Sequence, residues 1–353
     1  MTLASKPLIL VTGASGFVGS NVVYEALKAG YRVRGTVRSK KVDLIKEAYA
    51  TYKEQFEVTL IDDVASNDFS VALKGSFLDV EAVVHVASPL PWATNPEKTL
   101  DGAINGALNV LRQGEAVGIK KFVVTSSLWA FFTASDPKVY SDHIITDKDW
   151  NAATQEQALA PGAPRVFVYG TSKTLAEKAV WEFAAQHPHI DVTTIGPPVI
   201  FGPFAPGSTP GGPTESALST NSFIYGLLNG TLPPDICRLS VDVRDVARAH
   251  VAALTAPDHT DFPNGQDRKR ILVAAPTLDW RVVVQYLGEK RPDVKSRLPT
   301  VEDPPRQLAS IDVSRAREVL GFESFIPGKE AILASVDDLL RLEGEWERNG
   351  LKV

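Results

Sequence analysis

A glycine-rich turn after the first apolar run limits the possible folds more than any other feature of this chain. The run Leu8–Thr12 leads directly into residues 13–19, with the sequence GASGFVG, and a helical segment follows. Between a strand and a helix, the first glycine permits a tight turn, the second lets backbone N–H groups approach a pyrophosphate, and the third lets the helix pack closely on the strand. The turn predicts a dinucleotide site formed by Gly13, Ser15, Gly16, Phe17, Val18 and Gly19.

Short β-rich runs alternate with helical stretches over the first 200 residues. In the helical stretches apolar residues recur every three or four positions, as at Leu100, Ile104 and Leu108. Continuous apolar runs suit a parallel sheet covered on both faces, and right-handed crossovers then predict a doubly wound α/β (Rossmann) fold. The expected strands are Leu8–Thr12, Tyr31–Thr36, Phe56–Ile61, Ala82–Val86, Lys121–Ser126 and Asp191–Ile195.

The character of the sequence changes after Pro197. A Pro-Gly-rich segment at 201–216 and an aromatic helix candidate at Phe223–Leu228 indicate a second, smaller lobe. A strand and helix pattern returns at 239–254, so the two lobes are expected to interleave. We expect residues 1–196 and 239–256 to form the dinucleotide-binding domain, and residues 197–238 and 257–353 to form the substrate-binding lobe.

Charge and composition exclude several classes of partner. The formal net charge is −5 and no five like charges run together, which argues against nucleic-acid binding. No stretch reaches the ~18 apolar residues of a membrane-spanning helix, and the start lacks the apolar region of a signal peptide. The single cysteine, Cys237, cannot form an internal disulfide, which fits a reducing compartment. We therefore expect a cytoplasmic monomer or homodimer with neither nucleic-acid nor membrane partners.

The second expected strand favours NADP(H) over NAD. Sites that prefer NAD place an acidic residue about 20 positions after the glycine turn, but no carboxylate lies between Glu25 and Asp43. An arginine there can pair with the 2′-phosphate of NADP(H), and Arg38, just past the strand, is the first choice. The basic residues of this region are Arg32, Arg34, Arg38, Lys40 and Lys41.

A tyrosine and a lysine four residues apart suggest a proton donor. Tyr169 and Lys173 would share one helix face. The neighbouring ammonium and a positive nicotinamide ring favour the phenolate and should lower the tyrosine pKa from its reference value of about 10, which would make the phenol a general acid. Ser127, after the fifth strand, is the best candidate to hold a substrate carbonyl. Thr125 and Ser126 are assigned to backbone or cofactor groups.

The six histidines show no metal-ligand spacing. We expect His85 to be a packed strand residue and the other five to lie at the surface. No metal is expected.

Together these motifs resemble the extended short-chain dehydrogenases/reductases, and the resemblance spans nearly the whole chain. It rests on the glycine turn, Ser127, Tyr169 and Lys173 in this order, with GPPVIFGP at 196–203 and VDVRDVA at 241–247. RGTVR at 34–38, HVASP at 85–89 and YGTSKTLAEKAVW at 169–181 are similar to the dihydroflavonol reductase branch, especially its fungal NADPH-dependent carbonyl and methylglyoxal reductases.

The resemblance implies a division of roles. Ser127 would orient the carbonyl, Tyr169 would protonate it, and Lys173 would lower the tyrosine pKa while binding the nicotinamide ribose, with hydride coming from NADPH. The further cofactor contacts it implies are Asp63 and Val64 at the adenine, Ala87 and Ser88 along the cofactor channel, and the backbone of Pro197 to Val199 at the carboxamide.

An apolar, aromatic pocket wall favours neutral aldehydes, ketones or keto esters as substrates. One alternative is sugar-nucleotide epimerase or dehydratase chemistry, but such enzymes usually keep NAD and an acid at the second strand. Another is a non-catalytic NADP-sensing regulator, which generally lacks the tyrosine and lysine pair. The candidate wall residues are Leu90, Trp92, Leu128, Trp129, Phe132, Val166, Pro198, Phe204 and Phe223.

Overall fold

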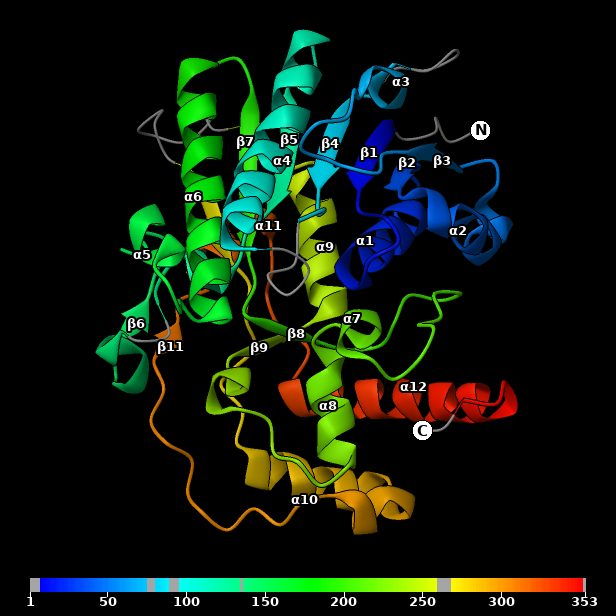
Figure 1. Ribbon diagram of the computed structural model, residues 1–353, viewed down its shortest axis with the longest axis vertical. Helices are drawn as coiled ribbons and strands as arrows, with labels where there is room; N and C mark the ends of the chain where they lie inside the picture. The colour runs from blue at the N-terminus through cyan, green and yellow to red at the C-terminus, as the bar shows by residue number, and fades with distance from the viewer. Residues whose placement is uncertain (1–6, 75–79, 89–94, 134–135, 259–267, 352–353) are drawn as a thin grey trace.

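A seven-stranded parallel sheet forms the centre of the protein (Figure 1). The computed structural model describes residues 7–74, 80–88, 95–133, 136–258 and 268–351. The strand order is β3-β2-β1-β4-β5-β7-β10, so the chain crosses from one side of β1 to the other between β3 and β4. The strands are β1 (Leu8–Thr12), β2 (Arg32–Val37), β3 (Phe56–Leu60), β4 (Ala82–His85), β5 (Lys121–Thr125), β7 (Asp191–Gly196) and β10 (Lys269–Leu272).

Helices cover both faces of this sheet because its strands carry apolar side chains on both faces. Ile9 and Val11 pack against α1 and α9, while Leu8 and Leu10 pack on the opposite side, against α4 and α6. The doubly wound fold is confirmed, and six strands lie where they were predicted. The covering helices are α1 (Phe17–Lys28), α2 (Val42–Ala48), α3 (Ser70–Leu73), α4 (Pro96–Ala116), α6 (Arg165–Gln186), α9 (Val243–Ala253) and α11 (Ser314–Leu320).

A smaller lobe lies below the sheet in the view of Figure 1. Its core is a separate apolar cluster that includes Phe201, Leu227, Trp280, Leu339 and Trp346. Its elements are β8 (Val199–Phe201), α7 (Glu215–Leu218), α8 (Asn221–Leu228), α10 (Trp280–Lys290) and α12 (Gly328–Arg348). At the side of the sheet lie β6 (Ile144–Ile145), paired with β11 (Ser310–Ile311), and α5 (Gln155–Leu159).

Two segments lie elsewhere than expected. β10 pairs with β7 in the main sheet, so residues 257–353 do not all belong to the smaller lobe. This strand is difficult to recognise in the sequence because it begins with two charged residues, Lys269 and Arg270. Both are nevertheless buried, because each pairs with a carboxylate. Within 239–256, β9 (Ser240–Asp242) pairs with β8 outside the main sheet, whereas α9 packs on α1 as expected.

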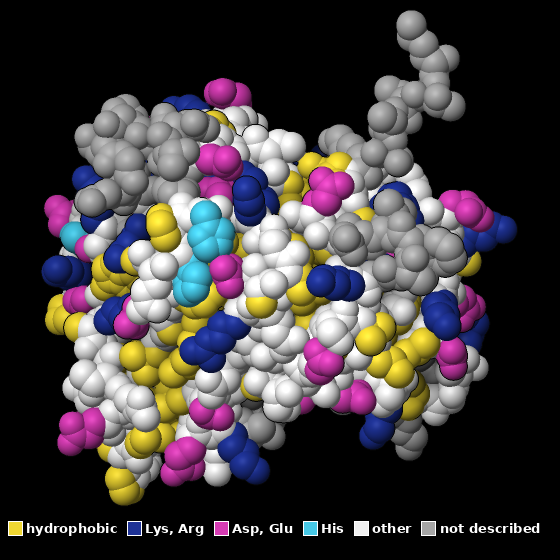
Figure 2. All heavy atoms as spheres, turned by 90° about the horizontal axis from the view of Figure 1, so that it is seen from above, with side chains coloured by type: hydrophobic (Ala, Val, Ile, Leu, Met, Phe, Trp, Pro, Cys, Tyr) yellow, Lys and Arg dark blue, Asp and Glu magenta, His cyan; other side chains and the backbone are white. Residues whose placement is uncertain are grey.

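The surface carries charges of both signs. On the face shown in Figure 2, Lys and Arg side chains are interspersed with Asp and Glu. Within the described ranges, no helix is long and apolar enough to cross a bilayer.

Candidate active site

The glycine turn leaves the backbone N–H groups at the start of α1 without a capping side chain. Gly13 has φ +69°, and a Cβ on this residue would lie 3.0 Å from Ala87 Cα. A Cβ on Gly19 would lie 2.1 Å from the Gly13 carbonyl oxygen, so the helix packs closely on the turn. Gly16 is the N-cap of α1, where no side chain accepts from the helix and no acidic residue lies in the first turn. Such a helix start attracts an anion, and these residues therefore fit a dinucleotide pyrophosphate.

Replacing Gly19 by alanine should weaken NADPH binding about tenfold or more and destabilise the fold by about 1–3 kcal/mol. The added methyl group would force the helix away from the turn. Fluorescence titration with NADPH and urea unfolding measure both effects. Gly211→Ala is the matched control, because a Cβ there meets nothing within 4 Å. Unchanged NADPH affinity in Gly19→Ala would contradict this role of the turn.

Two arginines of the predicted cofactor region, Arg34 and Arg38, have different surroundings. Arg34 is buried, where its Nε donates to Glu57 Oε1 (2.7 Å) and its Nη1 to the Ala72 carbonyl (2.7 Å). Arg38 is exposed just past the end of the strand, and no hydrogen bond or ion pair joins its side chain to another described residue. Arg38 is therefore the one of the two that could hold a 2′-phosphate.

Arg38→Asp should raise the KM for NADPH about 10–100-fold, since a charge-assisted hydrogen bond contributes about 1.5–3 kcal/mol. The KM for NADH, which has no 2′-phosphate, should change little. Steady-state kinetics with both nucleotides measure this. Lys53→Asp makes the same charge change at an exposed site between α2 and β3 and should affect neither value. Equal increases for both nucleotides would refute the assignment.

The other predicted cofactor contacts lie where strands of the main sheet end. Thr12 Oγ1 accepts from the backbone N–H groups of Val86 and Ala87 (both 3.1 Å), which holds residues 86–88 beside the glycine turn. Asp63 follows β3, where its carboxylate accepts from the Ala65 N–H and the Ser66 hydroxyl. Val64 lies next to it and packs toward Gly106 of α4. Pro197 to Val199 follow β7, and the Pro197 carbonyl accepts from the N–H of Leu128 (2.8 Å).

Ser127, Tyr169 and Lys173 lie together. Ser127 follows β5 and is buried, with its Oγ accepting from the Trp129 N–H (3.3 Å). Tyr169 and Lys173 stand one turn apart on α6, and the phenol shares a hydrogen bond with the Ser127 side chain. Lys173 is buried, and its Nζ donates to the Thr125 carbonyl (2.9 Å). A hydroxyl, a phenol and an amine thus meet at the end of β5.

The pKa of Tyr169 is shifted in the direction opposite to the one predicted from the sequence. Burial raises the pKa of the phenol above its ordinary value, and the hydrogen bond with Ser127 offsets this only in part. Burial also lowers the pKa of Lys173 to about 8, against the opposing effect of Glu177. In the protein alone the amine therefore loses its charge at a lower pH than the one at which the phenol would ionise. In the protein alone, Tyr169 is a protonated phenol at neutral pH.

Two buried histidines lie near Ser127, Tyr169 and Lys173. His85 is a packed residue of β4, as predicted, and burial lowers its pKa to about 3. His250 on α9 was expected at the surface but is wholly buried, which lowers its pKa to about 4. Its Nδ1 bonds to the Val246 carbonyl (2.7 Å), which can only accept, so Nε2 is the nitrogen that accepts from the Thr125 hydroxyl (2.7 Å). Among the described residues, no cluster of His, Cys, Asp and Glu could hold a metal ion.

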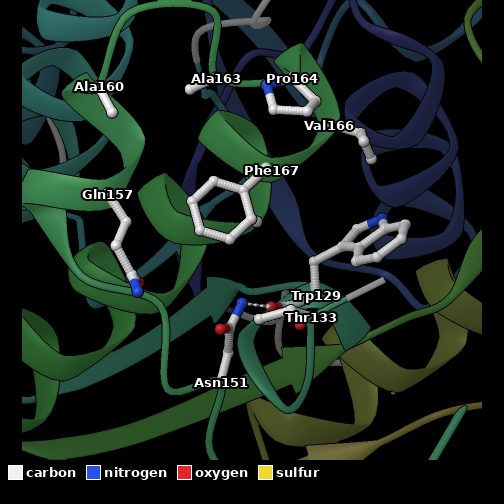
Figure 3. Close-up of a pocket in the computed structure, with 10 residues that line it drawn as sticks. Trp129, Thr133, Asn151, Gln157, Ala160, Ala163, Pro164, Val166 and Phe167 are labelled. Carbon is white, nitrogen blue, oxygen red and sulfur yellow. Dashed lines mark hydrogen bonds between the residues drawn. The ribbon is translucent and has the colours of Figure 1, made fainter. Parts of the chain in front are cut away.

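A cleft of about 460 Å³ lies beside the site, between α5, the start of α6 and the segment after Ser127 (Figure 3). Trp129 and Val166, two predicted wall residues, line it, and they stand close in sequence to Ser127 and Tyr169 respectively. The Asn151 side chain donates to the Trp129 carbonyl at its base (2.8 Å). The lining residues are Trp129, Thr133, Asn151, Gln157, Ala160, Ala163, Pro164, Val166, Phe167 and Gly170.

The remaining predicted wall residues do not line this cleft. Leu128 and Phe132 are buried in one apolar cluster, and Phe204 in that of the smaller lobe, where it packs on Phe17. Pro198 is half-buried, while Phe223 is exposed on α8. Leu90 and Trp92 lie outside the described residues.

Sequence reasoning missed two charged residues of the site. Glu177 lies one helical turn after Lys173, so the spacing that paired Tyr169 with Lys173 could have found it. Arg270 bonds to Glu177 from β10, the strand that sequence analysis did not identify.

Comparisons with known proteins agree with the family that the sequence motifs resemble. Residues 9–267 match the NAD dependent epimerase/dehydratase family. The chain is 33% identical to a putative NADPH-dependent methylglyoxal reductase of Candida albicans, over 96% of this chain and 100% of that protein. It is 31% identical to aldehyde reductase 2 of Sporidiobolus salmonicolor, over 97% of each. The crystal structure of Gre2 from Candida albicans in complex with NADPH matches with a TM-score of 0.78 and 30% identity, covering 95% of this chain and 99% of that one.

Proposed function

Because the chain belongs to the NAD dependent epimerase/dehydratase family, the extended short-chain dehydrogenases/reductases, we propose that it reduces the carbonyl group of aldehydes, ketones or keto esters with NADPH. The observation that carries the proposal is the meeting of Ser127, Tyr169 and Lys173 at the end of β5. That end of the sheet also holds the open start of α1 and the exposed Arg38.

The three side chains have different roles in this reaction. NADPH, when bound, supplies the hydride that the carbonyl carbon accepts. The Ser127 hydroxyl donates a hydrogen bond to the carbonyl oxygen and fixes its position. Tyr169 gives its phenolic proton to that oxygen, which completes the alcohol. The Lys173 ammonium binds the nicotinamide ribose and stabilises the phenolate that remains.

The cleft beside the site supports a neutral substrate. None of the ten residues that line it is charged, and Trp129, Val166 and Phe167 give it an apolar wall. A sugar nucleotide would need basic groups for its phosphates. The epimerase alternative is therefore weaker, and the Tyr169 and Lys173 pair argues against a regulator without catalysis.

NADPH oxidation with aldehydes, ketones and keto esters tests the proposal, and chromatography of sugar nucleotides incubated with the protein tests the epimerase alternative, which consumes no NADPH overall. We expect turnover with neutral carbonyl compounds and with NADPH in preference to NADH. Turnover of sugar nucleotides alone would favour the epimerase alternative, and absence of turnover with every compound would favour the regulator.

We also propose that the chain works in the cytoplasm as a monomer or homodimer. Its single cysteine, Cys237, is free and buried, which suits a reducing compartment. Light scattering after size-exclusion chromatography tests the oligomeric state, and a tetramer would contradict it.

A further inference from the structure

A buried carboxylate, Glu177, lies behind the catalytic residues. Glu177 follows Lys173 by one turn of α6 and is 3% exposed. Every group that bonds to it donates, so the side chain is held purely as an acceptor, which suits the charged carboxylate. The donors are Ser126 Oγ (2.5 Å), Arg270 Nε (2.7 Å), Thr194 Oγ1 (2.9 Å) and Trp181 Nε1 (3.2 Å).

Arg270 fixes this carboxylate from β10. Its guanidinium lies between the rings of Phe131 and Trp150, 3.7 and 3.6 Å from their centroids. Its remaining nitrogens donate to backbone carbonyls of the segment that follows Ser127: those of Asp147 (2.8 Å), Asp149 (2.5 Å) and Ala130 (3.3 Å). These contacts on both faces and along the edge hold the guanidinium in a single position. Its hydrogen bond to Glu177 therefore holds that carboxylate in place as well.

Glu177 and Lys173 face the same small space. A cavity of about 20 Å³ between α4, α6 and the ends of β4 and β5 is lined by both side chains, together with His85 and Thr125. Ser126, which bonds to Glu177, directly precedes Ser127. The Glu177 carboxylate therefore lies beside the catalytic residues at two points, near Lys173 in the cavity and next to Ser127 through its bond to Ser126.

We propose that Glu177, fixed by Arg270, is a positioning residue that holds Lys173 in its charged form and so sets the alkaline limit of the reaction. This rests on the proposed function, in which the Lys173 ammonium stabilises the Tyr169 phenolate.

The other titratable groups around Lys173 do not supply this negative charge. His85 on β4 and His250 on α9, which reaches the site through Thr125, are neutral at working pH because burial lowers the pKa of each. The Tyr169 phenol is neutral because burial raises its pKa. Arg270 on β10 is positive and pairs with Glu177 itself. Among these groups, Glu177 supplies the negative charge that raises the pKa of Lys173. It thereby opposes the effect of burial, and the resulting pKa is about 8.

Titrating Lys173 in the cofactor-free protein tests the proposal. The Nζ signal of ¹⁵N-lysine-labelled protein, assigned by its loss in Lys173→Met, should titrate near pH 8 in the wild type. In Glu177→Gln the midpoint should fall by about one pH unit, since a neighbouring opposite charge shifts a pKa by about 1–3 units. The alkaline limb of kcat/KM should move to lower pH by the same amount, because the ammonium form is then lost earlier.

Three further variants make the test decisive. Glu177→Gln leaves Arg270 as an unpaired buried charge, so the double variant Glu177→Gln/Arg270→Met removes both charges and keeps the fold if the single variant does not. Glu177→Asp retains the charge and should keep the midpoint closer to the wild-type value than Gln does. Asp191→Asn is the matched control: it neutralises a buried carboxylate paired with Lys121 and Lys269 at the opposite end of β7, and the Lys173 midpoint should not move.

An unchanged Lys173 midpoint in both the single and the double variant would overturn the proposal, as would equal shifts with Asp and Gln. The titration requires no turnover, so its outcome is independent of the carbonyl-reductase assay. A wild type that reduces no carbonyl compound would defeat the proposed function, whereas normal turnover with an unmoved midpoint would defeat only the role of Glu177.

Discussion

Replacing Tyr169 by phenylalanine should lower kcat about 10²–10⁴-fold and leave NADPH binding nearly unchanged. The phenol is protonated in the protein and shares a hydrogen bond with Ser127, so its oxygen lies where the carbonyl oxygen would be held. Phenylalanine keeps the ring and its packing on α6 but carries no proton to give. Steady-state kinetics with a neutral ketone and fluorescence titration with NADPH measure the two quantities separately.

Tyr24→Phe is the matched control for this experiment. Tyr24 is also a half-buried tyrosine on a helix that covers the sheet, but it lies away from Ser127 and packs against Tyr52. Its loss should leave kcat at the wild-type value. If Tyr169→Phe turned over as fast as this control, another group would be the proton donor.

Truncating Arg270 to alanine should lower the free energy of unfolding by about 3–5 kcal/mol. The change would leave the Glu177 carboxylate buried without its cation, three backbone carbonyls without their donor, and a cavity between Phe131 and Trp150. Urea unfolding followed by circular dichroism measures the loss.

Arg281→Ala provides the comparison for this stability measurement. It breaks an arginine–carboxylate pair of the same length, 2.7 Å, with Asp279 at the N-cap of α10, but there the arginine side chain is 43% exposed. Water can replace the lost partner, so the free energy of unfolding should hardly change. Equal losses in the two variants would mean that the burial of the Arg270 pair has no bearing on its effect.

The sequence predicted the parts of the fold and site that depend on local patterns. Gly13 and Gly19 are required by close backbone approaches within one strand–turn–helix unit, and Gly16 caps the helix between them, so their spacing was sufficient to identify the unit. Tyr169 and Lys173 share a helix face through the same local geometry. Five of the six predicted strands are short runs of mostly buried residues, whereas β3 lies at the edge of the sheet, where Leu60 is 55% exposed.

The rest depends on contacts between residues far apart in the chain. β10 begins with Lys269 and Arg270, which read as surface residues until Asp191 and Glu177 are placed beside them. His250 of α9 is buried where it bonds to Thr125 of β5, a residue 125 positions earlier in the chain. The direction of the Tyr169 pKa shift also required structure, because it is set by the burial of Tyr169 and of the neighbouring amine rather than by their spacing.

Reduction of a neutral ketone with NADPH carrying two deuterium atoms at C4 of the nicotinamide tests the assigned chemistry most directly. We predict one deuterium on the carbinol carbon of the alcohol and a hydroxyl proton derived from solvent through Tyr169. The Tyr169→Phe variant should bind the labelled nucleotide and yield almost no alcohol. A product whose carbinol carbon carries hydrogen from solvent, or full product formation without the phenol, would contradict the account.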